Sequence, residues 1–140
     1  MRNAIIFLDS GDTLVDESTE VRIKGKVVDH AEFFTGIKEV LFQLKNAGFR
    51  VALVADGLVE SFDNIYQQHE METYFEVRAI SETVGVCKPA GEMFKTAMEK
   101  MNLEEADKKY IIMIGNNLER DIVGANRMGI TSVLAGYSPR

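Results

Sequence analysis

Residues 4–14 read AIIFLDSGDTL, an apolar run that stops at Asp9 and continues into a turn containing Gly11. A short apolar run bounded by a turn is typical of a strand buried on both faces of a parallel sheet. A carboxylate at the end of such a strand lies at the sheet edge, among outward-pointing backbone N–H groups. There it is able to bind a cation or to attack phosphorus. Asp9 is therefore the first candidate for a functional residue.

The same pattern recurs farther along the chain. Residues 51–55 (VALVA) stop at Asp56-Gly57, and residues 110–114 (YIIMI) stop at Gly115-Asn116. Ligands of open parallel sheets bind at the carboxyl ends of the strands. The polar residues that follow these runs, together with Asp9, thus mark one candidate site. Two further strands are predicted at 76–80 and 131–135.

The segments between these strands have apolar residues at helical spacing. One predicted helix is capped by Thr35 and closed by Gly48, and its inward face holds Ile37, Val40, Leu41 and Leu44. Further helices are predicted at 58–69, from Pro89 onward with Phe94, Ala97, Met98 and Met101 inward, and at 118–128. Alternating strands and helices predict a doubly wound, Rossmann-like α/β fold, with a parallel sheet of about five strands and helices on both faces. Residues 1–140 are expected to form a single domain.

Residues 19–33 interrupt this alternation. Their polar and apolar side chains alternate at period two around Lys24-Gly25, which predicts a β-hairpin. The hairpin leaves the loop that follows the first strand, so it is expected to stand over the site as a small flap. The alternative, an edge hairpin without a role in the site, is equally open at this stage.

Composition excludes several classes of partner. The net charge is −6, and no cluster of Lys and Arg provides the footprint that duplex nucleic acid requires. No apolar run approaches the roughly 20 residues that span a bilayer, and residues 4–8 are too short for a signal peptide. Cys87 is the only cysteine, so an intrachain disulfide is impossible. We expect a cytoplasmic protein with no membrane partner.

Three motifs, in order, resemble those of the haloacid dehalogenase superfamily. Residues 9–14 (DSGDTL) are similar to its first motif, Asp-x-Asp-Gly-Thr-Leu. Residues 86–89 (VCKP) resemble its lysine motif, and residues 115–121 (GNNLERD) resemble its acidic motif, Gly-Asp-x-x-x-x-Asp. The resemblance covers nearly the whole chain. It implies a phosphatase-like member with degenerate motifs and a small cap or none.

The resemblance also implies roles for single residues. Asp9 would be the nucleophile and a ligand of Mg²⁺, and Lys88 would pair with Asp9 and with the phosphoryl oxygens. The other implied metal ligands are the Gly11 carbonyl, Asn116 and Asp121. Thr13, Asp56 and Gly57 are assigned to substrate binding. The implied partner is a phosphorylated small molecule or a phosphorylated macromolecule.

Three departures weaken the implied activity. Gly11 stands where the family's phosphatases have an acid/base aspartate, and the neighbouring Asp12 is not expected to replace it. Ala55 stands where the family has a hydroxyl, and Asn116 replaces an acidic residue. Loss of general acid–base help costs roughly 10²–10⁴ in rate, so the enzyme is expected to be slow on common substrates.

Two other functions stay open. A non-catalytic, phosphoryl-binding regulatory domain would explain the three departures together. Metal-independent displacement at carbon, as in the superfamily's dehalogenases, ranks last. Those relatives enclose the substrate with a helical cap, whereas this chain has room only for the hairpin between Leu14 and Thr35. A homo-oligomer whose hairpins cover neighbouring sites is a further hypothesis. Glu119 and Arg120 are interpreted as solvated helix surface.

Overall fold

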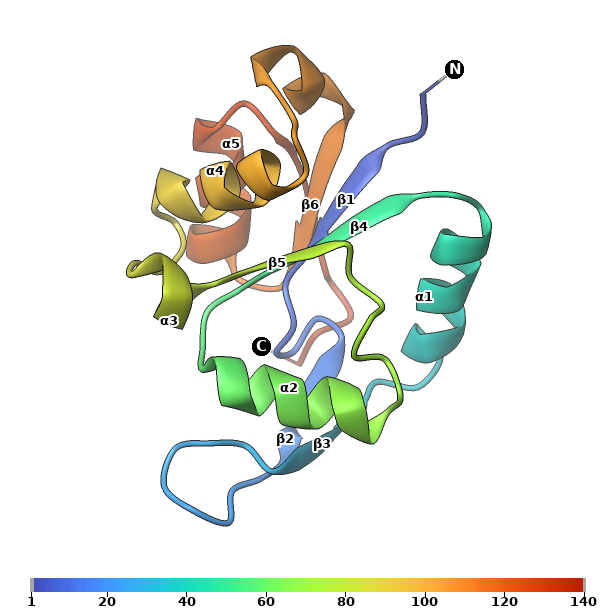
Figure 1. The fold of residues 1–140 in the computed structure, drawn as a ribbon, viewed down its shortest axis with the longest axis vertical. Coiled ribbons are helices and arrows are strands. Elements are labelled where there is room, and N and C mark those ends of the chain that lie inside the picture. The colour runs from blue at the N-terminus through green and yellow to red at the C-terminus, as the bar shows by residue number, and fades with distance from the viewer. Residues whose placement is uncertain (1, 140) are drawn as a thin grey trace.

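The structure is a computed structural model that describes residues 2–139, and its centre is a five-stranded parallel sheet (Figure 1). The strand order is β5-β4-β1-β6-β7, with β1 in the middle. The strands are β1 (Ile5–Leu8), β4 (Arg50–Ala55), β5 (Val77–Ile80), β6 (Ile111–Gly115) and β7 (Thr131–Leu134). Every predicted strand is present, and the predicted doubly wound α/β fold is confirmed.

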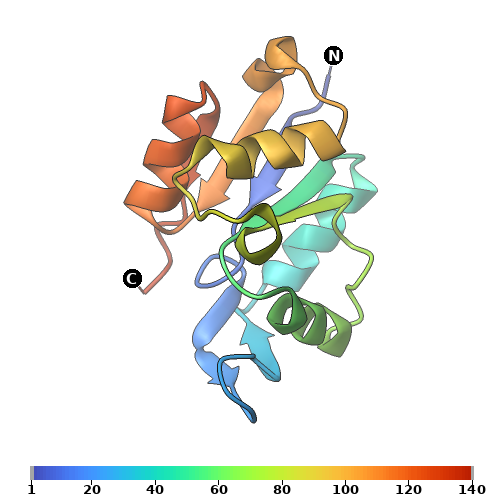
Figure 2. The same ribbon diagram turned by 60° about the vertical axis from the view of Figure 1, so that its left-hand side comes forward.

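Alternate residues of the central strands bury opposite faces of the sheet, as strand geometry requires. Ile6 and Leu8 of β1 pack with α1 (Ile37–Asn46) and α2 (Val59–Gln68) on one face. Ile5 and Phe7 pack with α4 (Gly91–Lys100) and α5 (Gly124–Arg127) on the other face. The two groups of helices lie on opposite sides of the sheet (Figures 1 and 2). Burial on both faces explains why these strands are apolar throughout rather than alternating.

The first helix differs from its prediction in two details. Its N-cap is Gly36, with φ 87°, and no side chain caps the helix, so the prediction of Thr35 as the cap was wrong. Val40 is 49% exposed, whereas Leu41 is 2% exposed and lies at the centre of the contact with the sheet. Val40 is at the margin of the apolar stripe of the helix, and the sheet covers the middle of that stripe at Leu41.

The later helices agree more closely with the sequence. Helix α4 begins at Gly91 rather than at Pro89, and its four predicted inward residues are all buried. The segment predicted at 118–128 is a π-helical turn, η2 (Leu118–Val123), that continues into α5. Two short helices, α3 (Ser81–Val84) and η1 (Glu105–Tyr110), were not predicted. No helix within residues 2–139 is long and apolar enough to cross a membrane.

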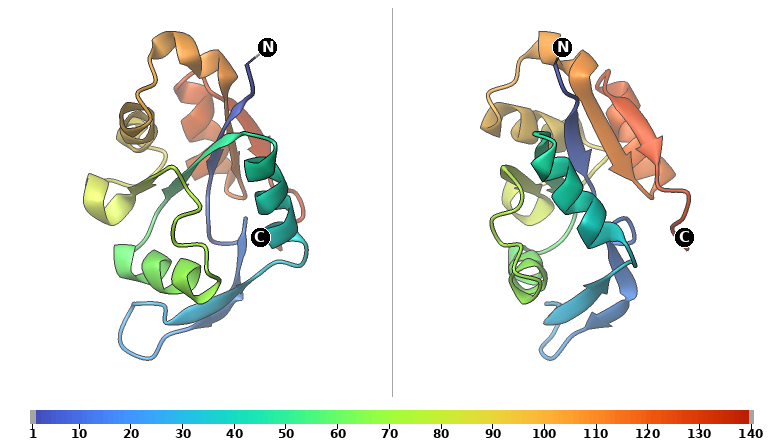
Figure 3. Two further views of the ribbon diagram at one scale, coloured as in Figure 1. Left: turned by 45° about the vertical axis from the view of Figure 1, so that its right-hand side comes forward. Right: turned by 90° about the vertical axis from the view of Figure 1, so that its right-hand side faces the viewer.

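A two-stranded antiparallel hairpin extends beyond the carboxyl ends of the sheet strands (Figure 3). It consists of β2 (Val15–Val21) and β3 (His30–Phe33), so it begins four residues earlier than the predicted range of 19–33. The hairpin is fixed to α2. The Val28 N–H, two residues before β3, donates to Ser61 Oγ at 2.9 Å, and the Ala31 N–H of β3 donates to Gln68 Oε1 at 2.9 Å. The predicted hairpin is confirmed, and it lies beside the loop that follows β1.

Candidate active site

A cavity of about 610 Å³ opens at the carboxyl ends of β1, β4 and β6. Its floor comes from the ends of these strands, and its rim comes from η2, the start of β2 and the C-terminal segment. The lining residues are Asp9, Gly11, Asp12, Glu17, Asp56, Lys88, Asn116, Asn117, Leu118, Glu119, Arg120, Asp121, Leu134, Ala135, Gly136 and Ser138. The predicted candidates Thr13 and Gly57 are not among them.

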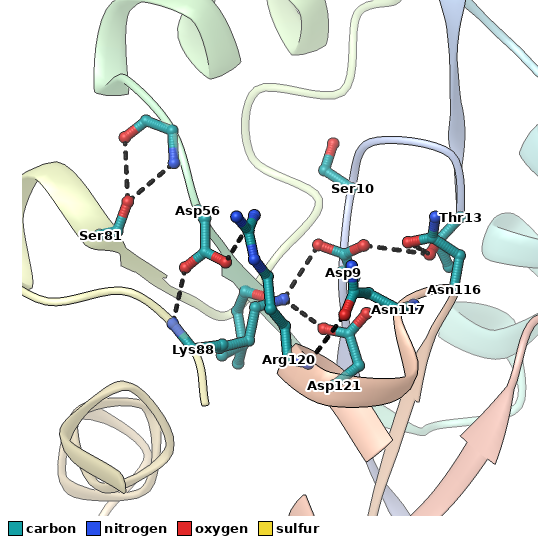
Figure 4. Close-up of polar contacts among 12 residues, drawn as sticks. Asp9, Ser10, Thr13, Asp56, Ser81, Lys88, Asn116, Asn117, Arg120 and Asp121 are labelled. Atoms are coloured by element: carbon teal, nitrogen blue, oxygen red, sulfur yellow. Dashed lines mark hydrogen bonds and ion pairs between the residues drawn. The ribbon is translucent and has the colours of Figure 1, made fainter. Parts of the chain in front are cut away.

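Asp9 follows the last residue of β1 and is held at both carboxylate oxygens (Figure 4). Its backbone N–H donates to the Ile114 carbonyl at 3.1 Å, which extends the sheet by one residue. Lys88 Nζ donates to Oδ1 at 3.0 Å, and Thr13 Oγ1 donates to Oδ2 at 3.2 Å. The side chain is 14% exposed, so a fixed carboxylate faces the cavity.

Lys88 lies beneath the cavity with a side chain that is 1% exposed. Nζ donates to Asp9 Oδ1 at 3.0 Å, to Asp121 Oδ1 at 2.5 Å and to the Val54 carbonyl at 2.8 Å. An ammonium group has three donors, and all three are used. Burial opposes the charge, but Asp9, Asp121 and Asp56 outweigh it and raise the pKa of Lys88. The lysine therefore stays protonated and fixed.

Asp121 completes this buried group from the first turn of η2. Its side chain is 1% exposed, and Oδ2 accepts from the Asn117 N–H at 3.1 Å. Burial raises the pKa of Asp121, although Lys88 acts in the opposite direction. A Cβ atom on Gly115 would lie 2.2 Å from Asp121 Oδ2. The close approach of this carboxylate to the strand therefore requires glycine at position 115.

The loop after Asp9 is a tight turn around one carbonyl group. The backbone N–H groups of residues 13–15 all donate to the Ser10 carbonyl at 2.8–3.2 Å. Asp12 takes the left-handed conformation, with φ 56°, and is 1% exposed. Its Oδ1 accepts from the Glu17 N–H at 2.9 Å. Asp12 thus fixes the backbone of β2 at Glu17.

Asp9 and Asn116 present adjacent oxygen atoms that suit a hard cation. Thr13 Oγ1 lies 3.2 Å from Asp9 Oδ2 and 3.4 Å from Asn116 Oδ1. Mg²⁺ prefers oxygen ligands and keeps several waters, so this pair fits it. Both Asp121 oxygens instead accept from Lys88 and Asn117. Within residues 2–139, no three His, Cys, Asp or Glu side chains group as a metal site. The roles of Gly11 and Asp121 as ligands stay predictions.

The two residues that follow β4 form polar contacts with neighbouring segments. Asp56 Oδ1 accepts from the Lys88 N–H at 2.9 Å, and Oδ2 lies 3.6 Å from Arg120 Nη1. The Gly57 N–H donates to Ser81 Oγ at 2.8 Å. Asp56 also lines the cavity, but the substrate-binding roles of Asp56, Gly57 and Thr13 stay predictions.

Arg120 and Glu17 are among the cavity residues that sequence reasoning did not assign to the site. Arg120 was interpreted as solvated surface, and its side chain is indeed 54% exposed, yet it reaches Asp56 across the rim. Glu17 was not considered at all. It lies two residues after the buried Val15 on β2, and both residues line the hollow beside α2 although the pairing of β2 with β3 is irregular after Asp16. The two-residue spacing from Val15 was the available signal for Glu17.

The fold is that of a doubly wound α/β protein, and the site places the Asp9 carboxylate at the carboxyl end of the central strand β1. Residues 9–135 match the family model described as haloacid dehalogenase-like hydrolase. The chain therefore belongs to the haloacid dehalogenase-like hydrolase family, as the motifs predicted.

Named relatives agree with this assignment. The chain is 33% identical over 103 residues to glyceraldehyde 3-phosphate phosphatase of Pyrococcus abyssi, which covers 73% of this chain and 42% of that protein. It is 31% identical over 120 residues to the Pyrococcus furiosus enzyme of the same name, with coverages of 81% and 48%. The chain thus spans less than half the length of these relatives. A solved phosphatase of the superfamily from Thermococcus onnurineus has the same fold, with a TM-score of 0.78 at 14% identity, over 94% of this chain and 85% of that one.

Proposed function

We propose that this protein is a Mg²⁺-dependent phosphoester hydrolase that forms an aspartyl-phosphate on Asp9. One observation carries the proposal: the Asp9 carboxylate faces a cavity of about 610 Å³ while Lys88 and Thr13 hold its two oxygens. A carboxylate is a weak nucleophile unless it is fixed in a reactive orientation. The contacts of Asp9 supply that orientation.

The reaction has two displacements at phosphorus. In the first, a carboxylate oxygen of Asp9 bonds to phosphorus, and the bond from phosphorus to the ester oxygen breaks. The leaving oxygen then takes up a proton. In the second, water bonds to phosphorus, the bond to Asp9 breaks, and inorganic phosphate leaves with one proton of that water lost. Lys88 holds positive charge beside the reacting oxygens throughout, since burial and its three contacts prevent it from moving.

The charge of the cavity explains why a cation is needed. Among the described residues 2–139, six carboxylate side chains and two cationic ones line it, so a phosphate dianion would be repelled without further positive charge. Asp9 and Asn116 would hold Mg²⁺ beside the phosphoryl group, with the Gly11 carbonyl as the third expected ligand. When bound, the ion supplies charge that stabilises the phosphoryl oxygens.

A small hollow beside the cavity suits the leaving group. It has a volume of about 250 Å³ and lies between the hairpin and α2. Phe62 and Ile65 provide apolar contacts, whereas Arg22 and Lys26 provide cations. We infer a small phosphorylated metabolite as substrate, consistent with relatives named for glyceraldehyde 3-phosphate. A phosphorylated macromolecule and a homo-oligomer stay hypotheses.

A second candidate function is a phosphoryl-binding regulatory domain without turnover. It is favoured by the end of β4, where Ala55 offers no hydroxyl and the Gly57 N–H is already donated to Ser81. Loss of one electrostatic donor costs roughly 10²–10³ in rate. Binding of a phosphate ester without any release of phosphate would support this function.

The experiment combines a phosphate mimic with a substrate panel. Beryllofluoride and Mg²⁺ should give a ¹⁹F NMR adduct with the wild type and none with Asp9→Asn. Asp29→Asn is the matched control, because Asp29 is exposed and directly precedes β3, outside the lining of the cavity. The panel includes triose phosphates, pyrophosphate, p-nitrophenyl phosphate and a phosphopeptide, each with and without Mg²⁺. Equal behaviour of the wild type and Asp9→Asn in both assays would refute the hydrolase proposal.

A further inference from the structure

The proposed reaction needs a group that gives a proton to the leaving oxygen and later takes one from water. Proton transfer of this kind contributes roughly 10²–10⁴ in rate. This group must lie within hydrogen-bond reach of the ester oxygen whose bond to phosphorus breaks. Gly11, two residues after the nucleophile, has no side chain to do this. Another residue must supply the proton if turnover is to be appreciable.

We propose that Glu17, from strand β2, is the general acid and base of this hydrolase. The inference rests on the proposed function and adds a catalytic residue to it. In the first displacement, the Glu17 carboxylic acid gives its proton to the leaving oxygen. In the second, its carboxylate takes a proton from the attacking water, so Glu17 is protonated again at the end of the cycle.

The position of the Glu17 carboxylate carries the proposal. A Cβ atom built on Gly11 would lie 1.9 Å from Glu17 Oε2, 2.9 Å from its Cδ and 3.2 Å from its Cγ. A C–C bond is about 1.5 Å long, so an aspartate at position 11 would place its carboxyl group in the same space. Glu17 therefore fills, from a neighbouring strand, the volume that a side chain at position 11 would fill from the loop.

Glu17 also lies on the boundary between the two hollows of the site. It lines the cavity of about 610 Å³ that contains Asp9, and it lines the smaller hollow of about 250 Å³ beside α2. A phosphoryl group on Asp9 with its leaving group in the smaller hollow would place the breaking bond between them. A general acid is required at that boundary.

The other carboxylates of the cavity floor are engaged in fixed contacts. Asp121 binds Lys88 and the Asn117 N–H. Asp56 binds the Lys88 N–H and pairs with Arg120. Asp121 does not line the smaller hollow. Asp56 lines both hollows, but its two carboxylate oxygens face the Lys88 N–H and the Arg120 guanidinium.

Asp12 acts on Glu17 as a positioning residue. Its Oδ1 accepts from the Glu17 backbone N–H at 2.9 Å, and it is 1% exposed. The bridge between Gly11 and Val15 adds a second tie between the loop and β2. Strand β2 in turn pairs with β3, which is anchored on α2. The carboxylate of Glu17 is thus carried by a backbone that is fixed on several sides.

Leaving-group dependence tests this role. For Glu17→Gln we expect a fall of about 10²–10³ in kcat/KM with glycerol phosphate, whose alkoxide must be protonated. With p-nitrophenyl phosphate the first displacement should slow less than about tenfold, because that anion leaves without a proton. The second displacement lacks its base, so p-nitrophenolate should appear in a burst. Phosphorylated enzyme should then accumulate and be visible by intact mass after acid quench.

Matched variants separate this role from a structural one. Glu32→Gln on β3 changes an exposed carboxylate of the same hairpin and should leave both substrates unaffected. Gly11→Asp alone should lower activity, because its side chain collides with Glu17. Gly11→Asp combined with Glu17→Gly removes the collision and returns a carboxylate to the same volume, so it should recover at least tenfold over Glu17→Gln with glycerol phosphate. Thermal melts of each variant confirm folding.

The outcomes distinguish the two proposals. Glu17 is supported if Asp9→Asn abolishes phosphorylated enzyme while Glu17→Gln accumulates it. Glu17 is overturned, and the hydrolase proposal kept, if turnover needs Asp9 but Glu17→Gln matches Glu32→Gln with both substrates. Both proposals are overturned if neither the wild type nor Glu17→Gln forms phosphorylated enzyme with any substrate of the panel.

Discussion

The floor and the rim of the cavity are built by different means. At the floor, Lys88, Asp9 and Asp121 are joined by charged hydrogen bonds of 2.5–3.0 Å, with side chains between 1% and 14% exposed. The hairpin, whose strand β2 contributes to the rim, is tied to α2 by neutral contacts such as the one from the Val28 N–H to Ser61 Oγ. A buried ion pair is strongly destabilised when one partner is lost, whereas a single neutral hydrogen bond contributes about 1 kcal/mol. The floor therefore tolerates little change, and the rim is where chemistry can be altered at low cost.

Replacing Lys88 should have the largest effect on stability. Lys88→Met leaves two buried carboxylates without their cation, and we expect a loss of about 3–5 kcal/mol in the free energy of unfolding. Urea unfolding followed by circular dichroism measures it. Lys100→Met removes an exposed contact to the Arg78 carbonyl and should cost less than about 1 kcal/mol. Equal losses in the two variants would mean that the floor is not held by charge.

Gly115 tests how tightly the floor is packed. A Cβ there would lie 2.2 Å from Asp121 Oδ2, so Gly115→Ala should lower the free energy of unfolding by about 1–3 kcal/mol. Gly136→Ala is a suitable control, because a Cβ at that position meets nothing within 4 Å. A Gly115→Ala variant as stable as Gly136→Ala would contradict the close packing of Asp121.

Binding of Mg²⁺ should stabilise the fold through Asp9. An ion present at about ten times its Kd adds about 1.4 kcal/mol, which raises the melting temperature by a few degrees in a domain of this size. Differential scanning calorimetry with Mg²⁺ or EDTA measures the shift. Asp29→Asn should keep the shift and Asp9→Asn should lose it, and retention in Asp9→Asn would place the cation elsewhere.

The rim gives the smallest expected effect. Ser61→Ala removes the acceptor for the Val28 N–H and should cost about 1 kcal/mol. Hydrogen exchange should show faster opening of residues 28–33 while β1 and β6 stay protected. Ser18→Ala breaks an exposed contact to Asp16 and serves as the control. Equally slow exchange in both variants would mean that the hairpin is held chiefly by its apolar contacts.

The sequence predicts the floor better than the rim, for a physical reason. Strands such as β1 and β6 are apolar because both faces are covered, and parallel strands bring Asp9 and Asn116 to one edge whatever the details of packing. The approach of Lys88 follows from its place between β5 and α4. The position of Glu17 depends instead on how the hairpin packs against the loop after β1, and on the absence of a side chain at Gly11. Local sequence spacing determines neither the packing of the hairpin nor the space that Glu17 fills. The exposure of Val40 is a similar case, since the extent of helix coverage is a tertiary property.

The C-terminal segment crosses the loop that carries the candidate nucleophile. The Tyr137 hydroxyl donates to the Thr13 carbonyl, and Ala135, Gly136 and Ser138 line the cavity. The start of β1 lies at the opposite end of the sheet (Figure 1). An affinity tag fused after Ser138 would therefore lie beside the opening of the cavity, where its side chains could bind metal or substrate. A tag ahead of β1 would be remote from it, so recombinant protein for assays is best purified through the amino end.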